Sequence, residues 1–334
     1  MGIVVGDDAS PAHVCLECGF FDEAAGSRDW RAQGRRRGAI CLIVLAVFAI
    51  GAGSARPGET FSLAGSGTIV FVKAHDLWTI GPDGSGLRRL TNTLKRSEAD
   101  PAWSPDGGKL AYDDGGSVYV ADVDGTGATD ITTPSIKGDK SYFGAGGCDS
   151  DPTWSPNGRL LAVSAIVAGC TGAAGEIDAM TPSGSGRRVI EQDYEGLLGG
   201  DTQPAWGPGG KRIAITRSDS LRMASGPYVF DLYLLNARTG KVVLKLTRDG
   251  RSTSPDFSPD GQQIVFVDRG TVTVRTAAGR LIPIVRGGDP AWSPDGKKIV
   301  YVAAGGLRVM NANGSANRLI LSCSCAGPDW QRLR

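Results

Sequence analysis

The stretch DPAWSPDG at residues 100–107 occurs a second time, unchanged, at residues 289–296. Weaker copies begin at residue 151 (DPTWSPNG), residue 203 (QPAWGPGG) and residue 254 (SPDFSPDG), and a partial copy, GPDWQ, begins at residue 327. Their aromatic residues are 35 to 52 positions apart. This period is the size of a four-stranded propeller blade with variable loops, so the chain is predicted to be built from repeated blades.

The segments between the motifs predict three further strands in each repeat. Each repeat has an apolar β-type run, a second such run, a glycine turn and a last run, as in TIVFV (68–72), DLWTI (76–80), the turn at Asp83-Gly84 and LRRLT (87–91). The turn residues tolerate the positive φ that a tight hairpin requires. Because each of these elements occurs six times, we predict an all-β fold, a six-bladed β-propeller with four-stranded blades.

The motif itself has a structural meaning in such a blade. SPDG is typical of a turn, since proline presets φ at its second position and glycine takes the positive φ at its end. The preceding aromatic residue is expected to pack between neighbouring blades. The first repeat lacks its first strand, and the last motif has a first strand only, so the C-terminal strand is predicted to complete the N-terminal blade and close the ring.

The pattern D/S-P-x-W-S-P-D-G-x-x-I resembles the repeat of TolB-like β-propeller proteins. The resemblance covers about residues 66–334 and is carried by five full motifs. It implies an exported, non-catalytic propeller that binds a partner.

The front of the chain differs from the repeats. Residues 1–37 are a polar tail that ends in three arginines, residues 38–55 carry no charge, and residues 56–67 form a linker to the propeller at 68–334. A basic flank, an apolar run and small residues are typical of a secretory signal. Two alternatives stay open: a cleaved signal with the true start downstream of Met1, or a retained membrane anchor with a cytoplasmic tail. Both put the propeller outside the cytoplasm, in a periplasmic, secreted or membrane-anchored form.

Charge and histidine content narrow the function. The chain has 36 Lys+Arg and 35 Asp+Glu, which argues against a nucleic-acid partner. His75 is the only histidine after the signal, so neither a histidine triad nor a multi-histidine metal site can be built, and no G-x-S-x-G occurs. We expect a non-catalytic protein without metal or cofactor. The alternative is a hydrolase or lyase that uses carboxylates in the propeller channel.

The residue before the motif proline is an aspartate three times, at Asp100, Asp151 and Asp289. These channel carboxylates are predicted to converge at the start of the inner strands. They would either gather a cation with oxygen ligands or bond backbone N–H groups of their own or a neighbouring blade.

Four cysteines follow the signal, which suggests disulfides in an exported chain. Cys148 and Cys170 lie in connections expected at the same end of blade three, so we predict that they pair. Cys323 and Cys325 are expected to pair with each other.

The longest connections, around residues 133–150, 166–175, 192–202 and 217–230, are all expected on one face of the ring. Long ordered loops in a compact domain are usually functional, although neutral insertion is the alternative. The predicted partner is an envelope protein, peptide or glycan, bound by a monomer. The candidate contacts are Tyr142, Phe143, Tyr194, Arg217, Arg222 and Tyr228.

Overall fold

The fold is taken from a computed structural model of the chain. It describes residues 67–93, 97–132, 148–166, 175–191, 200–218 and 229–332, all within the compact unit Thr60–Arg334. All regular structure in these residues is β-strand, and none of them forms a helix that is long and apolar enough to cross a membrane.

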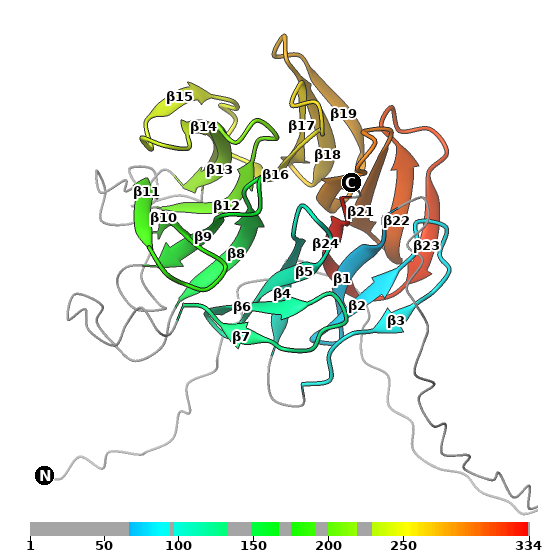
Figure 1. Ribbon diagram of the computed structural model, residues 1–334. Helices are drawn as coiled ribbons and strands as arrows, with labels where there is room; N and C mark the ends of the chain where they lie inside the picture. Colours follow the sequence, from blue (N-terminus) through cyan, green and yellow to red (C-terminus); the bar gives the residue numbers. More distant parts are fainter. Residues whose placement is uncertain are drawn as a thin grey trace, which may run out of the picture. The chain divides into compact units, whose positions relative to one another are not determined.

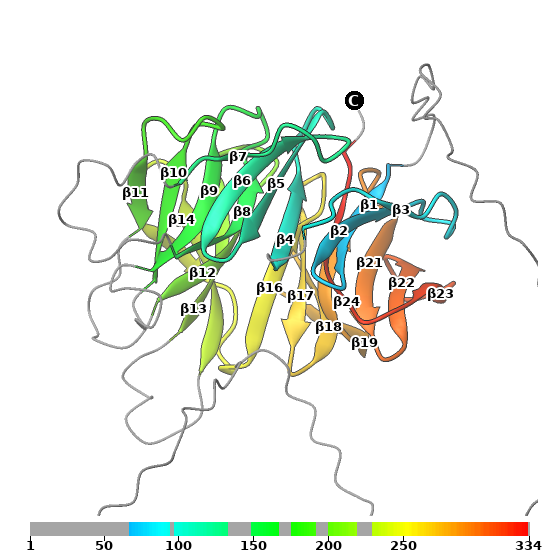
Figure 2. The ribbon, with the colours of Figure 1, turned by 90° about the horizontal axis from the view of Figure 1, so that it is seen from below.

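The strands form six four-stranded antiparallel sheets arranged as a ring (Figures 1 and 2). Neighbouring inner strands contact one another all the way round, so that every sheet packs against the next. The six-bladed β-propeller predicted from the repeats is therefore confirmed. We number the blades one to six from the N-terminus.

The inner strands all carry the X-Pro-x-aromatic motif and are β24 (Cys325–Trp330), β4 (Glu98–Trp103), β8 (Asp149–Trp154), β12 (Asp201–Trp206), β16 (Ser252–Phe257) and β20 (Gly288–Trp292). The second strands are β1 (Ile69–Lys73), β5 (Lys109–Asp114), β9 (Leu161–Ile166), β13 (Arg212–Ser218), β17 (Gln263–Asp268) and β21 (Lys298–Ala303). The third strands are β2 (Asp76–Ile80), β6 (Ser117–Asp122), β10 (Gly175–Met180), β14 (Phe230–Asn236), β18 (Thr271–Thr276) and β22 (Gly306–Asn311). The outer strands are β3 (Arg88–Arg89), β7 (Thr129–Asp130), β11 (Arg188–Glu191), β15 (Val242–Lys245), β19 (Leu281–Arg286) and β23 (Arg318–Ser322).

The SPDG motif forms the turn between the inner and second strands. In blade two, Gly107 has a φ of +69° and donates its N–H to the Ser104 carbonyl at 2.8 Å. The Ser104 hydroxyl accepts the N–H of Lys109 at 2.9 Å and donates to Asp106. Serine, aspartate and glycine each therefore have a separate task in the turn.

The motif aromatics pack between blades, as predicted. Trp206 of blade four is 5% exposed and lies against Ala162 and Ile177 of blade three. Trp154 packs in the same way against Ala111 and its neighbours in blade two. Because one large side chain fills each junction, the blades depend on each other for their cores.

The C-terminal strand closes the ring by pairing with β1 in blade one (Figure 1). Trp330 is 3% exposed and its indole N–H donates to the Gly67 carbonyl at 2.9 Å. Gln331 donates its backbone N–H to the Thr68 carbonyl at 2.9 Å and its side-chain amide to the Gly107 carbonyl at 3.0 Å. The end of the chain is thus tied both to blade one and to the SPDG turn of blade two.

Candidate functional site

The inner strands surround a central channel with a cavity of about 180 Å³. The same motif positions of successive blades line its wall, and the motif prolines and Arg332 are among the lining residues. The residues at the X position of X-Pro line it in all six blades: Asp100, Asp151, Gln203, Ser254, Asp289 and Gly327.

The X position has the same unusual backbone in every blade. Its φ is positive in all six residues, from +45° at Asp100 to +53° at Ser254 and Gly327. The pairing between the inner and second strands shifts register at this place in each sheet. A positive φ is strained for any residue but glycine, so six occurrences in six blades indicate a bulge that the fold requires.

Side chains at the X position link one blade to the next. Asp151 accepts the N–H of Gln203 at 3.4 Å, and Gln203 in turn accepts the N–H of Ser254 through Oε1 at 2.9 Å. Asp289 accepts the N–H of Gly327 at 3.4 Å. For Asp151 and Asp289 the structure thus shows bonds to a neighbouring blade. The part of the chain that the structure describes holds no group of three or more His, Cys, Asp or Glu residues arranged for a metal.

Burial raises the pKa of several carboxyl groups in the channel wall. It raises the pKa of Asp151, and it raises the pKa of Asp289, to which the negative charge of Asp151 adds. Asp329 has a pKa raised to about 6, first by burial and further by the charge of Asp256, while Arg332 opposes the shift. Asp329 accepts the N–H of Trp103 at 2.7 Å, so this carboxyl is also a link between blades.

Turns and connections divide between two faces of the ring. On the first, which we call the loop face, the turn between the second and third strands meets the connection that leads to the next blade. Its backbone bonds include Glu98 N–H to His75 O (3.2 Å), Asp149 N–H to Gly116 O (2.9 Å) and Gly287 N–H to Gly270 O (3.1 Å).

The opposite face holds the two short turns of each blade, which also bond to each other. Examples are Val123 N–H to Gly108 O (3.2 Å) and Ala312 N–H to Lys297 O (2.8 Å). All the strand ends from which the long connections leave therefore belong to the loop face, including those at Ile166, Gly175, Ser218 and Phe230.

Of the predicted contact residues, Tyr142, Phe143, Tyr194, Arg222 and Tyr228 lie outside the described residues. Arg217 lies near the end of β13 and its side chain is 12% exposed. Its guanidinium donates to both carboxylate oxygens of Asp201, at 2.6 and 2.7 Å, and lies 4.9 Å from the ring centre of Tyr233. Arg217 thus ties strands of blade four together beneath the loop face, and a role in binding stays a prediction.

Sequence reasoning missed a set of buried carboxylates at the entrance of the inner strands. Glu98, Asp149 and Asp201 are 1%, 2% and 0% exposed. Asp149 pairs with Arg187 at 2.7 Å, and Glu98 accepts the N–H of Leu77 at 2.9 Å. The signal that could have found them is an acidic residue two positions before X-Pro, in blades two, three and four.

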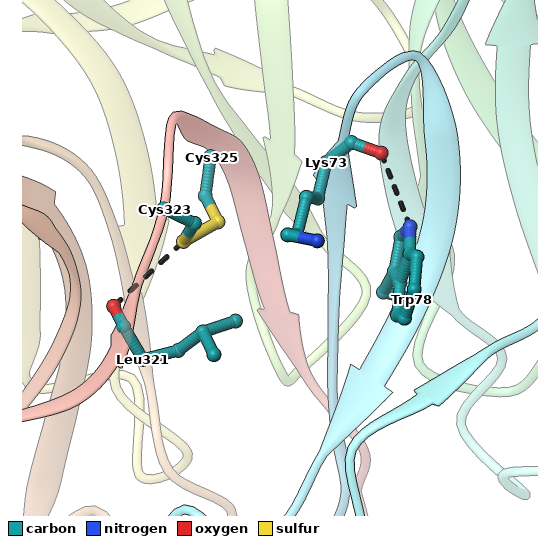
Figure 3. Close-up of a disulfide and its surroundings, with 5 residues drawn as sticks. All are labelled: Lys73, Trp78, Leu321, Cys323 and Cys325. Atoms are coloured by element: carbon teal, nitrogen blue, oxygen red, sulfur yellow. Dashed lines mark hydrogen bonds between the residues drawn. A yellow bond between two sulfur atoms is a disulfide. The ribbon is translucent and has the colours of Figure 1, made fainter. Parts of the chain in front are cut away.

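The cysteine predictions have different outcomes. Cys323, in the connection that leads into β24, and Cys325, the first residue of β24, are joined by a disulfide with their Cα atoms 5.4 Å apart (Figure 3). Lys73 and Trp78 of blade one lie across from this pair (Figure 3). The Lys73 ammonium is 4.4 Å from the centre of the Trp78 ring. Cys148 is disulfide-bonded. Its predicted partner Cys170 lies outside the described residues, so that pairing stays a prediction.

Several solved structures have a fold similar to this one. The structure of TolB from Acinetobacter baumannii is similar with a TM-score of 0.59 and 21% identity, over 80% of this chain and 67% of that chain. Putative TolB from Agrobacterium tumefaciens is similar with a TM-score of 0.57 and 22% identity, over 77% and 88% of the two chains. The chain is TolB-like in its fold. A chain in a nidogen/laminin complex shares this fold, with a TM-score of 0.60 and 13% identity over 79% and 97% of the two chains.

Sequence comparison matches a smaller part of the chain. No family model matches the chain. The uncharacterized protein Atu1656 of Agrobacterium fabrum is 30% identical over 181 residues, which are 54% of this chain and 53% of that protein. The uncharacterized peptidase YuxL of Bacillus subtilis is 25% identical over 211 residues, 51% of this chain and 29% of that protein. The matches thus span about half of the first relative and less than a third of the second.

Proposed function

We propose that the chain is an exported, non-catalytic β-propeller that binds a protein, peptide or glycan at the cell envelope through its loop face. The observation that carries this proposal is that polar residues of the channel bond one blade to the next. Asp151, Gln203 and Asp289 bond to the next blade, and Asp329 does the same from a neighbouring motif position. The recurring polar positions hold the ring together, which leaves recognition to the variable connections of the loop face.

Two further points support this proposal. A chain of the same fold has been solved in a complex between two proteins, nidogen and laminin. The segment 38–55 has the pattern of an export signal or anchor, so we place the propeller outside the cytoplasm. We further propose that it acts as a monomer without a cofactor. In that oxidising environment the Cys323–Cys325 disulfide would persist.

A pull-down from envelope extract tests the proposal. The wild-type chain is expected to capture a partner, and joint replacement of Tyr142, Tyr194 and Arg222 by alanine is expected to abolish capture with little change in Tm. The matched control replaces Asp124, Asn236 and Asn313, which lie at the short turns of the opposite face. Loss of capture in the control, together with retention in the loop-face variant, would show that the wrong face has been assigned.

A second candidate function is hydrolysis or lyase chemistry in the channel. It is favoured by one observation: Asp151 and Asp289 line the same cavity, where burial raises the pKa of Asp289 and the negative charge of Asp151 raises it further, as in a carboxylate pair that divides acid and base roles. The similarity to a protein named as a peptidase points the same way. Loss of a measurable glycan- or peptide-cleaving activity in Asp151→Asn or Asp289→Asn, with an unchanged Tm, would favour this function over binding.

A further inference from the structure

The Cys323–Cys325 disulfide is partly exposed at the passage from blade six to blade one. Both cysteines keep part of their surface open to solvent. Cys148 is a contrast within the same chain, because it is disulfide-bonded and only 9% exposed. Exposed disulfides are the ones that exchange with thiols, whereas buried cysteines are inert. The position of the Cys323–Cys325 pair therefore favours exchange.

This disulfide contributes little as a structural cross-link. Only Ser324 lies between the two cysteines, and the stabilisation from a disulfide grows with the length of the loop that it closes. The strand β24 is fixed by other contacts, since its backbone pairs with β1 and Trp330 packs in a core shared with blade six. The fold therefore tolerates opening of this bond, which an exchange reaction requires.

A positive charge is held beside Cys325. Lys73 is directly opposite Cys325 in the pairing of β1 with β24, so the two side chains are neighbours on one face of the sheet. The Lys73 ammonium lies over the Trp78 ring, 4.4 Å from its centre, and the uncharged ring does not neutralise it. The close-up shows the Lys73 side chain between the disulfide and Trp78 (Figure 3).

The carboxylate closest to Lys73 in register is engaged elsewhere. Asp76 is opposite Lys73 in the pairing of β1 with β2, but it accepts hydrogen bonds from Arg89 at 2.6 Å and from the N–H of Thr93 at 3.0 Å. Within the described part of the chain, no carboxylate lies at ion-pair distance from Lys73. A lysine beside a cysteine favours its thiolate, and a more stable thiolate leaves a disulfide faster. Cys325 is therefore the better leaving group.

We propose that the Cys323–Cys325 disulfide is an exchange site that oxidises a pair of thiols in a partner protein or peptide. The first partner thiolate attacks Sγ of Cys323, forms a mixed disulfide there and expels Cys325 as a thiolate beside Lys73. The second partner thiol loses its proton, attacks the partner sulfur of the mixed disulfide and expels Cys323 as a thiolate.

The electrons and protons of this exchange balance. The partner loses two electrons and two protons and becomes a disulfide, while Cys323 and Cys325 gain both electrons and take up both protons as thiols. One disulfide is consumed for each partner that is oxidised, so the transfer is stoichiometric and agrees with a non-catalytic chain. The inference does not depend on partner capture at the loop face, because the test supplies its own dithiol.

The test mixes the full chain, without oxygen, with a reduced peptide with blocked ends, Cys-Gly-Ser-Gly-Cys. Mass spectrometry should find the peptide oxidised in equimolar amount as the Cys323–Cys325 disulfide is lost. The double variant Cys323→Ala/Cys325→Ala should oxidise the peptide at least about tenfold more slowly.

Variants at Lys73 keep the disulfide and test the proposal even where the cysteine variant does not fold. Lys73→Gln should slow peptide oxidation at least about tenfold with an unchanged Tm, and Lys73→Arg, which keeps the charge, should retain most of the rate. The matched control is Lys298→Gln at the start of β21, on the short-turn side of blade six, and it should react like the wild type.

Three results would overturn the inference. The first is no oxidation of the peptide by the wild type, or equal oxidation by the double cysteine variant. The second is an unchanged rate in Lys73→Gln, since the charge would then have no part in the exchange. The third is oxidation of glutathione as complete as that of the peptide at equal thiol concentration, since the site would then take single thiols of small molecules.

Discussion

Deleting residues 327–334 should destabilise the whole propeller rather than one blade. The deletion removes most of β24, the only described strand that pairs with the inner side of β1. Blade one would then keep three strands, and β1 would become an open edge. The inter-blade contacts of Trp330 with blade six would also be lost.

The size of the effect follows from the contacts that are removed. Truncation of a buried tryptophan such as Trp330 costs about 3–5 kcal/mol. The deletion also removes hydrogen bonds of Trp330, Gln331 and Asp329 to Gly67, Thr68, Gly107 and Trp103. At about 1 kcal/mol for each bond, the total is about 7–9 kcal/mol, which lies within the typical range of about 5–15 kcal/mol for the whole stability of a domain.

Trp330→Ala alone should lower the free energy of unfolding by about 4 kcal/mol. At about 2–4 °C for each kcal/mol in a domain of this size class, Tm should fall by roughly 8–16 °C. Thermal melts followed by circular dichroism measure both variants, and deletion of residues 333–334 alone is the control because these residues follow β24. If the chain lacking residues 327–334 melts within a degree or two of the intact protein, ring closure by β24 is refuted.

Three further outcomes are expected. Asp329→Asn should stabilise the fold by about 1–3 kcal/mol at pH 7.5 and hardly at all at pH 4. The reason is that the pKa of Asp329 is raised to about 6, so the wild-type protein loses stability as the pH rises from about 4 to 6 and this carboxyl ionises. Equal melting shifts at both pH values would contradict this. Non-reducing mass mapping should find Cys148 linked to Cys170, and a free Cys148 thiol would contradict the pairing. Arg217→Ala should cost about 3 kcal/mol in chemical denaturation, since it leaves its buried aspartate partner without a counter-ion; a change in urea midpoint within error would show that the ion pair contributes nothing.

The architecture was predictable from the sequence because it depends on local signals that repeat. The SPDG turns set the start of each second strand, and the spacing of Trp103, Trp154 and the other aromatics counts the blades. The partial motif at residue 327 predicted the closing strand. In each case proline, glycine or a large aromatic residue has one structural use that its neighbours in sequence reveal.

The interactions at the channel and beneath the loop face were less predictable. The positive φ of Asp100 and its counterparts follows from a shift in the pairing register between the inner and second strands. Sequence spacing does not give that register. Asp149 and Arg187 pair from the inner strand and from a position just before the outer strand of blade three, and Asp201 and Arg217 are directly opposed on consecutive strands. Such pairs follow from strand packing and not from any local pattern.

Partner binding at the loop face is the central proposal for this chain. Hydrogen–deuterium exchange of the full chain, with and without the partner captured from envelope extract, tests it most directly. We predict that the partner protects amides at the loop-face turns 115–116 and 269–270 and leaves the opposite turns 104–108 and 123–127 unchanged. Protection of the opposite turns, with none at 115–116 and 269–270, would contradict the claim.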